Sequence, residues 1–385
     1  MKHTHIMFFI GKGGVGKTTC SVATAIHLAD RGLKVLLVSL DPAHNAGDAL
    51  QLSLSDTKTA ITPNLEAIEI DLEQLMDRYL KRTAKAMKES YRYLRVINLE
   101  NLLDAVRYSP GIEEYATLEA LNAIITHDAE RYDTIIFDTA PTGLTLRVLS
   151  LPTISLRWIE KLTEIRTRIL RLRSSVEHIH GKQVFEIDGI KEPLASEEED
   201  DKTMQELLGY RSEIQQVHAV LTNPEMTSVV AVLNPEEMPF VETQRAAETL
   251  AKFRIPLKML IINKVLHTGQ IPSGMTPKLE KQEDVTARIR QTFSEHTIAE
   301  EHWRPEEPHG LEQLRQFSST PAEFFQALIA VNARVNNLEQ KDVSKDFSQT
   351  SQSCLRAKLY TAIKSLFTRK NILTVQQTDD TSLDN

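Results

Sequence analysis

The sequence predicts an α/β fold in which a mostly parallel sheet is covered by helices and a helical insertion forms a subdomain. Short apolar runs rich in β-branched residues alternate with stretches whose apolar residues recur every three to four positions. This alternation is typical of parallel strands joined by helical crossovers. Several helical stretches go beyond what a strand–helix–strand unit requires, and they predict the insertion.

The predicted elements begin with a strand over His5–Ile10, a glycine-rich segment and a helix over Cys20–Arg31. Gly32 ends that helix, because glycine adopts the left-handed conformation common after a helix. The other predicted strands are apolar runs of the kind buried in parallel sheets. They are Lys34–Leu40, Thr134–Phe137, Val229–Leu233 and Leu257–Ile262.

The predicted organisation is one α/β domain over residues 1–335 followed by a polar tail over residues 336–385. Helical insertions are expected at about 71–127 and 155–220. The tail contains one candidate amphipathic helix over 354–370, which has apolar residues on one face and basic residues largely elsewhere. The helical stretches that predict these insertions are Asp71–Tyr93, Leu94–His127 and Arg157–His180.

Composition restricts the class of protein. Acidic residues outnumber basic ones by 53 to 45 in 385 residues, so a general nucleic-acid binder is disfavoured and no nucleic-acid partner is expected. The two cysteines, Cys20 and Cys354, cannot form a CxxC pair or a disulfide framework. No run of ~18 apolar residues is present, and the N-terminus lacks the apolar core of a signal peptide. We therefore expect a cytoplasmic protein.

One segment matches the phosphate-loop pattern G-x-x-x-x-G-K-[ST] in full, between a predicted strand and a predicted helix. Its glycines let backbone N–H groups converge on phosphate oxygens, and the helix N-terminus adds partial positive charge. Lys17 is expected to bridge the β- and γ-phosphates and Thr18 to bind Mg²⁺. The predicted nucleotide-binding residues here are Gly11, Lys12, Gly13, Gly14, Val15, Gly16, Lys17, Thr18 and Thr19.

Two acids follow predicted strands. Asp41, in the sequence DPAHN, comes directly after Lys34–Leu40, and Asp138 comes directly after Thr134–Phe137. Parallel sheets place functional groups at the carboxyl ends of their strands, where Asp138 can hold Mg²⁺ and Asp41 can orient the attacking water. Taken alone, Asp41 is explained equally well by an Asp–Pro turn.

Together, GKGGVGKTT, DPAHN and DTAPTGLTLRVLSLP resemble the ArsA family of ATPases, which includes the arsenite-pump ATPase and the ATPase that delivers tail-anchored membrane proteins. The resemblance covers roughly residues 5–330. It implies that ATP and Mg²⁺ are the cofactors, that Asp41 is the water-orienting acid and that Asp138 is the metal-binding acid. It also implies that Asn263 contacts adenine. Position 266 is leucine, so the segment beginning Asn263-Lys264 lacks the acid of the guanine-binding pattern NKxD.

The second lysine of the loop, Lys12, marks the deviant phosphate loop of the wider family that contains MinD, ParA and the nitrogenase iron protein. In that family this lysine reaches the nucleotide of the partner subunit, which implies a homodimer here. Like an arginine finger, such a cation offsets charge on the transferring phosphoryl group. The alternative is an ordinary solvated lysine.

Three cellular functions are possible for an ATPase of this kind. The first is membrane-protein targeting, with an apolar client helix bound by the insertions. The second is driving an arsenite or other anion pump, which the shortage of cysteines disfavours. The third is a MinD-like cycle in which helix 354–370 makes peripheral membrane contact. No structural zinc is predicted, because the CxxC pair of the eukaryotic targeting members is missing.

Overall fold

The computed structural model describes residues 4–41, 45–90, 109–181, 184–187, 190–267 and 276–341. The chain divides into two compact units. The second unit is made of two separate stretches, so the chain leaves the first unit twice and returns to it each time. The first unit comprises Met1–Asp71, Ile124–Leu146 and Asn223–Asn385, and the second comprises Leu72–Ala123 and Arg147–Thr222.

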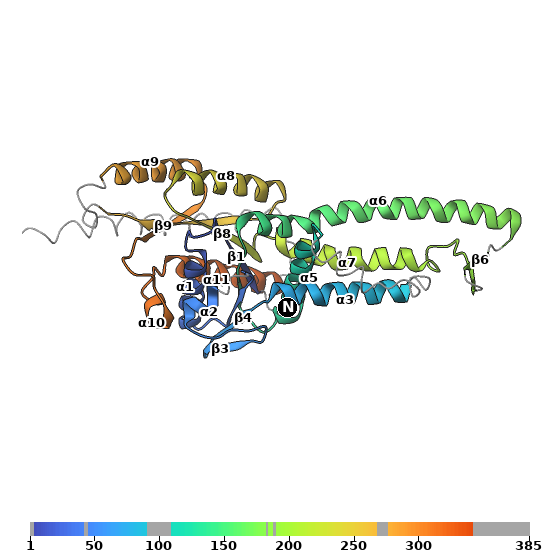
Figure 1. The fold of residues 1–385 in the computed structure, drawn as a ribbon, viewed down its shortest axis with the longest axis horizontal. Helices are drawn as coiled ribbons and strands as arrows, with labels where there is room; N and C mark the ends of the chain where they lie inside the picture. The colour runs from blue at the N-terminus through green and yellow to red at the C-terminus, as the bar shows by residue number, and fades with distance from the viewer. Residues whose placement is uncertain are drawn as a thin grey trace, which may run out of the picture. The chain divides into compact units, whose positions relative to one another are not determined.

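An eight-stranded sheet forms the centre of the first unit (Figure 1): β1 (His5–Ile10), β2 (Val35–Ser39), β3 (Thr59–Thr62), β4 (Leu65–Glu69), β5 (Thr134–Asp138), β8 (Thr227–Leu233), β9 (Leu257–Val265) and β10 (Thr297–His302). The strand order is β10-β9-β8-β1-β5-β2-β4-β3. Every neighbouring pair is parallel except β3 with β4. This arrangement confirms the predicted α/β fold class.

The central strands are apolar because both faces of the sheet are covered. Every residue of β1, β2 and β5 is buried, as expected for parallel strands between two helical layers. Phe8 of β1 stacks on Phe137 of β5, with 4.9 Å between the ring centroids. The register pairs Asp138 with Phe9 on one side and with Ser39 on the other. The carboxyl ends of these three strands therefore lie side by side at the same edge of the sheet.

Helices cover both faces of this sheet: α1 (Lys17–Asp30), α2 (Asn45–Leu50), α8 (Glu237–Lys252), α9 (Thr276–Thr292), α10 (Gly310–Leu314) and α11 (Thr320–Lys341). In Figure 1, α8 and α9 lie on one side of the sheet, whereas α1 and α11 lie on the other. Phe324 and Phe325 of α11 join buried residues of α1 and of β1 in one hydrophobic core. This core fixes the start of α1 against the carboxyl end of β1.

Three strands that the sequence analysis did not predict extend the sheet at its two ends. β4 and β3 lie beyond β2, and β10 lies beyond β9. β10 has the sequence TIAEEH, and β3 has the sequence TAIT. These strands are short and partly polar, so they lack the continuous apolar run that identified the central strands.

The second unit is mainly helical and consists of α3 (Leu72–Ser90), most of α5 (Ile112–Asp128) and of α6 (Thr142–His180), the hairpin of β6 (Val184–Ile187) with β7 (Ile190–Pro193), and α7 (Lys202–Thr222). The start of α7 is bound to α6. The guanidinium of Arg166 donates two hydrogen bonds to Asp201, at 2.9 and 2.6 Å. Asp201 also accepts a hydrogen bond of 2.8 Å from the N–H of Met204, so it caps α7.

The predicted helical stretches appear in the structure with different bounds. Asp71–Tyr93 corresponds to α3 (Leu72–Ser90), and Arg157–His180 lies within α6, which begins at Thr142 and continues through Pro152. Leu94–His127 is helical from Ile112 onward, whereas residues 91–108 lie outside the described residues, as do 342–385 with the predicted helix 354–370. Among the helices of the described ranges, none combines the length and the hydropathy that a membrane span requires.

Strand β10 carries a buried carboxyl group, Glu301, which is 5% exposed. Its Oε2 atom accepts a long hydrogen bond of 3.4 Å from the N–H of Ser318. Burial raises the pKa of Glu301 from its ordinary value of 4.5 to about 7, although Ser318 and Arg304 lower it in part. The folded protein therefore retains a proton that the unfolded chain releases at lower pH.

We expect replacement of this carboxyl group to change how stability depends on pH. The stability that Glu301 contributes is fully present below pH 4.5 and is lost as the pH rises through about 7. Relative to wild type, Glu301→Gln should therefore be more stable at pH 8 than at pH 5, by about 1–3 kcal/mol. Urea unfolding of both proteins at both pH values measures this difference, and an equal difference at pH 5 and pH 8 would contradict it.

Candidate active site

The predicted phosphate loop connects β1 to α1. A Cβ atom on Gly11 would lie 2.4 Å from the carbonyl oxygen of Val232, so the loop passes too close to β8 for any other residue. Gly14 and Gly16 have φ values of 81° and 89°, in the left-handed region that favours glycine. Helix α1 begins at Lys17 with no side-chain cap. Its N-terminus is therefore the kind of end that binds anions.

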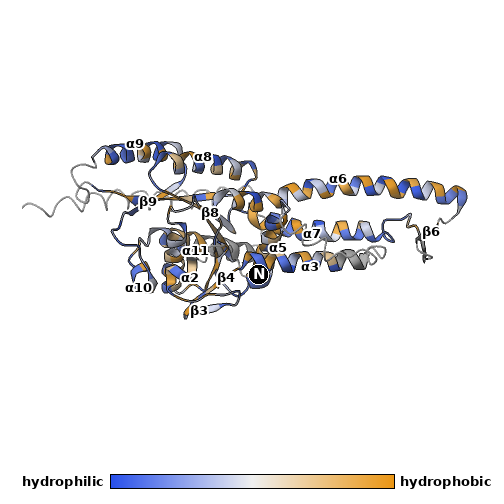
Figure 2. Ribbon diagram, in the orientation of Figure 1, coloured by the Kyte–Doolittle hydropathy of each residue, from blue (hydrophilic) through white to orange (hydrophobic). Residues whose placement is uncertain are grey.

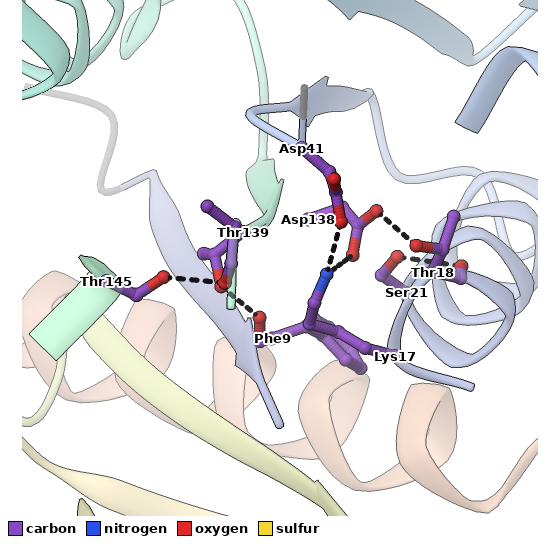
Figure 3. Close-up of polar contacts among 9 residues, drawn as sticks. Phe9, Lys17, Thr18, Ser21, Asp41, Asp138, Thr139 and Thr145 are labelled. Atoms are coloured by element: carbon purple, nitrogen blue, oxygen red, sulfur yellow. Dashed lines mark hydrogen bonds and ion pairs between the residues drawn. The ribbon is translucent and has the colours of Figure 1, made fainter. Parts of the chain in front are cut away.

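Four side chains meet at the carboxyl edge of the sheet (Figure 3). The Nζ atom of Lys17 lies 3.3 Å from Oδ2 of Asp41 and 3.4 Å from Oδ1 of Asp138. The hydroxyl of Thr18 donates a hydrogen bond of 2.7 Å to Oδ2 of Asp138. The structure thus brings together four residues that the sequence analysis predicted from three separate segments.

The two acids of this cluster differ in their surroundings. The side chain of Asp138 is fully buried, whereas that of Asp41 is 14% exposed. Burial raises the pKa of Asp138, the Lys17 ammonium and the Thr18 hydroxyl lower it, and the Asp41 carboxylate raises it further. Two carboxylates therefore share one ammonium group. The ionised form of Asp138, the more deeply buried of the two, depends on that positive charge for its stability.

The donor atoms of the cluster fit a magnesium ion that arrives with a nucleotide. The Oδ1 atom of Asp138 is buried, and apart from the ion pair with Lys17 at 3.4 Å it has no hydrogen-bond partner. Mg²⁺ prefers oxygen ligands and takes several of them from phosphates and water, so one hydroxyl and one carboxylate are enough protein donors. Within the described ranges, no group of three or more His, Cys, Asp or Glu side chains could hold a metal ion by itself.

The segment after β5 is bound to β1 and to itself. The hydroxyl of Thr139 donates a hydrogen bond of 2.7 Å to the carbonyl of Phe9, and that of Thr145 donates one of 2.9 Å to the carbonyl of Ala140 (Figure 3). Thr145 lies in the first turn of α6, which begins at Thr142. These bonds hold the acid, the loop and the start of α6 in one arrangement.

The loop opens into a cleft of about 840 Å³. This volume is within the range of ligand and cofactor sites. Asp41 and all the predicted loop residues line it except Val15, which is buried beneath the loop. Lys12 is half-buried there. The segment 302–309 supplies another part of the lining, which includes Trp303.

Asn263 lies in β9, lines the cleft and contacts the loop directly. Its Nδ2 atom donates a hydrogen bond of 2.7 Å to the carbonyl of Val15, and its Oδ1 atom accepts one of 2.9 Å from the N–H of Lys264. The predicted contact with adenine stays a prediction. Sequence reasoning missed Lys264, whose Nζ atom donates a hydrogen bond of 3.0 Å to the carbonyl of Gly14. The incomplete NKxD pattern was the signal that pointed to this position.

A glycine-rich loop that joins a buried strand to a helix N-terminus, with an acid at the carboxyl end of each of two neighbouring strands, defines the class of P-loop nucleoside triphosphatases. Within this class, the family model described as Anion-transporting ATPase matches residues 4–322, and the chain belongs to that family. The predicted resemblance is therefore confirmed, and the protein is an ATPase.

Curated relatives agree with this assignment. The chain is 33% identical over 313 residues to the putative arsenical pump-driving ATPase 2 of Aquifex aeolicus (strain VF5), covering 81% of this chain and 97% of that protein. It is 32% identical over 318 residues to ATPase GET3A of Arabidopsis thaliana, covering 81% and 82%. An ATPase ASNA1 homolog of Entamoeba histolytica is 29% identical over 317 residues, covering 81% and 92%.

The geometry of the loop predicts that its glycines differ in what they tolerate. A Cβ atom on Gly16 would lie 2.2 Å from Nδ2 of Asn263, at a φ of 89°, whereas one on Gly13 would have no atom within 4 Å. We expect Gly16→Ala to lower the stability of the nucleotide-free protein by about 2 kcal/mol or more, and Gly13→Ala by less than about 0.5 kcal/mol.

Urea unfolding without nucleotide measures both stabilities. Adding Asn263→Ala to Gly16→Ala should recover part of the loss, because it removes the clash but keeps the strained backbone. Equal stability of Gly16→Ala and Gly13→Ala would show that the loop does not have this conformation.

Proposed function

We propose that this ATPase hydrolyses ATP to ADP and phosphate with Mg²⁺, works as a homodimer, and couples hydrolysis to the handling of a membrane protein. The observation that carries the hydrolysis proposal is the position of Lys17 between Asp41 and Asp138 beside an open cleft. The buried acid suits a cation and the partly exposed acid suits a water molecule, so their surroundings support two different roles.

Each residue of the cluster has one role in the proposed reaction. Lys17 leaves its two carboxylate partners and binds the β- and γ-phosphates. Thr18 and Asp138 hold the magnesium ion, Asp138 directly or through a water. When bound, that ion supplies positive charge that offsets charge on the phosphates. Asp41 lines the cleft and orients the water that attacks the γ-phosphate.

The substitution Asp41→Asn separates binding from hydrolysis. It should lower kcat by about 10²-fold or more while ATP affinity changes by less than about threefold, because the acid acts on the water and not on the phosphates. Phosphate release and calorimetric ATP binding measure the two effects. Glu280→Gln, at an exposed position on α9, is the control. Full turnover by Asp41→Asn would rule out the proposed role.

The homodimer proposal is supported by Lys12, a half-buried cation at the cleft in the position that reaches the partner's nucleotide in the wider family. In a two-fold dimer each subunit would complete the site of the other. A cation aimed at charge that develops in the transition state contributes roughly 10²–10³-fold to kcat. Lys12→Ala should therefore bind ADP normally and hydrolyse ATP slowly.

Mixing two inactive variants tests whether Lys12 acts on the partner's site. In a heterodimer of Lys12→Ala with Asp41→Asn, the Lys12→Ala subunit keeps Asp41 and receives Lys12 from its partner. After random exchange of subunits, about a quarter of wild-type activity should return. If Lys12 acted within its own subunit, neither site would be complete and the mixture would stay inactive. Strictly monomeric protein in ATP and Mg²⁺ would also contradict the proposal.

Exposed apolar side chains of the second unit support the proposal that the protein binds an apolar partner. One side of α6 presents large apolar side chains at intervals of three and four residues, and Figure 2 shows hydrophobic positions recurring along this helix. Trp158 is 66% exposed and Ile179 is 75% exposed. We call this side the apolar seam of α6. Its residues are Ile154, Trp158, Leu162, Ile165, Ile169, Leu172, Val176 and Ile179.

Residues of α6 outside the seam make polar contacts instead. Besides the Arg166–Asp201 pair, Thr167 bonds to Glu198 at 2.9 Å and Arg173 to the carbonyl of Ala195 at 3.3 Å. An apolar hollow of about 260 Å³ lies between the seam and Leu194. Exposed apolar surface of this extent marks interaction sites, and a helix with its apolar side open fits a hydrophobic helix. This favours membrane-protein targeting.

Driving an anion pump is the second candidate function, favoured by the description of the family and by the name of the Aquifex relative. A three-thiol arsenite site would need cysteines that this chain lacks, so we expect As(III) to leave its ATPase rate unchanged. The membrane-cycling alternative depends on helix 354–370, which lies outside the described residues. It stays a prediction.

Two substitutions in the apolar seam test the targeting proposal. The double variant Ile165→Glu with Leu172→Glu should lower the soluble recovery of a co-expressed client, whose single apolar helix has ~20 residues, by about tenfold. Ser175→Glu, an exposed change on the same helix outside the seam, should leave recovery unchanged. If both variants recovered the client equally, the seam would not be its binding site. A rise in ATPase rate with As(III) would favour the pump instead.

A further inference from the structure

Lys264, the residue before the end of β9, has a strained backbone and a directed side chain. Its φ of +59° is in the left-handed region, which is unfavourable for any residue with a Cβ atom. The backbone N–H of Lys264 is held by Oδ1 of Asn263 at 2.9 Å. Its Nζ atom donates a hydrogen bond of 3.0 Å to the carbonyl of Gly14. The strain is thus found where the side chain reaches the phosphate loop.

Lys264 and its neighbour hold two consecutive carbonyl groups. Lys264 binds the carbonyl of Gly14, and Asn263 binds the carbonyl of Val15 at 2.7 Å. In the sheet, β8 lies between β9 and β1, the strand that leads into the loop. The contact therefore spans a whole strand and ties the loop to a part of the sheet that is not its neighbour.

Fixing these carbonyls also fixes the N–H groups of the loop. In a trans peptide the C=O of one residue and the N–H of the next point in opposite directions, and no cis peptide bond occurs among the described residues. Holding the carbonyls of Gly14 and Val15 therefore turns the N–H groups of Val15 and Gly16 away from these contacts, and that of Val15 makes a long hydrogen bond of 3.4 Å to the carbonyl of Lys12. Phosphate loops bind phosphate oxygens through such N–H groups.

We propose that Lys264 is a positioning residue of the nucleotide site, which orients the backbone donors of the loop toward the phosphates that ADP and ATP share. It acts through the carbonyl of Gly14. This inference rests on the nucleotide site of the proposed function, but it requires neither hydrolysis nor a dimer. A site held in place before the ligand arrives loses less conformational freedom on binding. We therefore expect Lys264 to raise nucleotide affinity and to leave turnover unchanged.

Binding of ADP and ATP to the full chain tests the proposal. Lys264→Met keeps most of the length of the side chain and removes its donor, so both dissociation constants should rise by the same factor, about tenfold. Lys264→Arg should recover most of the affinity. If Lys264→Met left both constants unchanged, the proposal would be wrong. A weakening of ATP alone would also overturn it, because that result means a contact with the γ-phosphate.

Amide hydrogen exchange without nucleotide separates positioning from direct phosphate contact. We expect faster exchange of the loop amides of residues 14–16 in Lys264→Met than in wild type, because their peptide planes are no longer held. Unchanged exchange would mean that Lys264 acts only on a bound ligand, which contradicts the proposal. Wild-type protein that binds neither ADP nor ATP would instead contradict the proposed function.

A second strained basic residue provides a matched control. Arg254 also has a φ of +59°, but it is exposed and does not line the cleft. Lys264→Gly and Arg254→Gly relieve the same kind of backbone strain, so their effects on stability should be similar. Only Lys264→Gly should weaken ADP binding, again by about tenfold. If Arg254→Gly weakened ADP binding equally, the loss of affinity would come from a general change in the protein and not from the contact of Lys264 with the loop.

Discussion

The ammonium group of Lys17 stabilises a carboxylate that the fold has buried completely. Asp138 ends β5, which lies between β1 and β2, so the loop after β1 and the acid after β2 both arrive beside it. A second acid at this distance raises the cost of ionising the first. In the proposed reaction Lys17 turns toward a phosphate, and Asp138 would then require another cation. The strand order thus supports the proposal that nucleotide and magnesium bind together in this site.

Sequence reasoning predicted the parts of the fold in which local pattern and tertiary environment agree. The central strands are buried on both faces, so their apolar runs are continuous, and Gly11 of the loop is required by the close passage of the loop over β8. β10 is partly polar and lies at one end of the sheet formed by the described residues, next to β9, so its sequence carries little strand signal. The contact of Lys264 with Gly14 depends on the order of three strands, which no local pattern encodes.

Periodicity predicted a helix over Arg157–His180, but it could not predict which side faces inward. The usual expectation places the apolar side in the core, whereas here the apolar seam is exposed and Arg166 binds Asp201 on the inner side. A buried ion pair contributes less to stability than apolar packing of similar volume, because both charges lose their hydration. Its two hydrogen bonds do fix the orientation of α6 relative to the start of α7. Ile159 and Leu170 of α6 are buried, so apolar packing and these polar contacts together leave the seam exposed.

The helix that carries the seam also begins at the active site. α6 starts at Thr142, four residues after Asp138, and continues without a break in its helical structure to His180. Thr139 binds the segment after β5 to β1, and Thr145 binds the first turn of α6 to that segment. Under the proposed function, a shift of this segment on loss of the γ-phosphate would therefore move the first turn of α6. Pro152 cannot donate the hydrogen bond to Val148 that a regular helix would contain, which makes this turn the easiest place to bend. Under the proposed function, α6 would be the one continuous element that runs from the segment after Asp138 to the apolar seam, and Pro152 is where it would bend most easily.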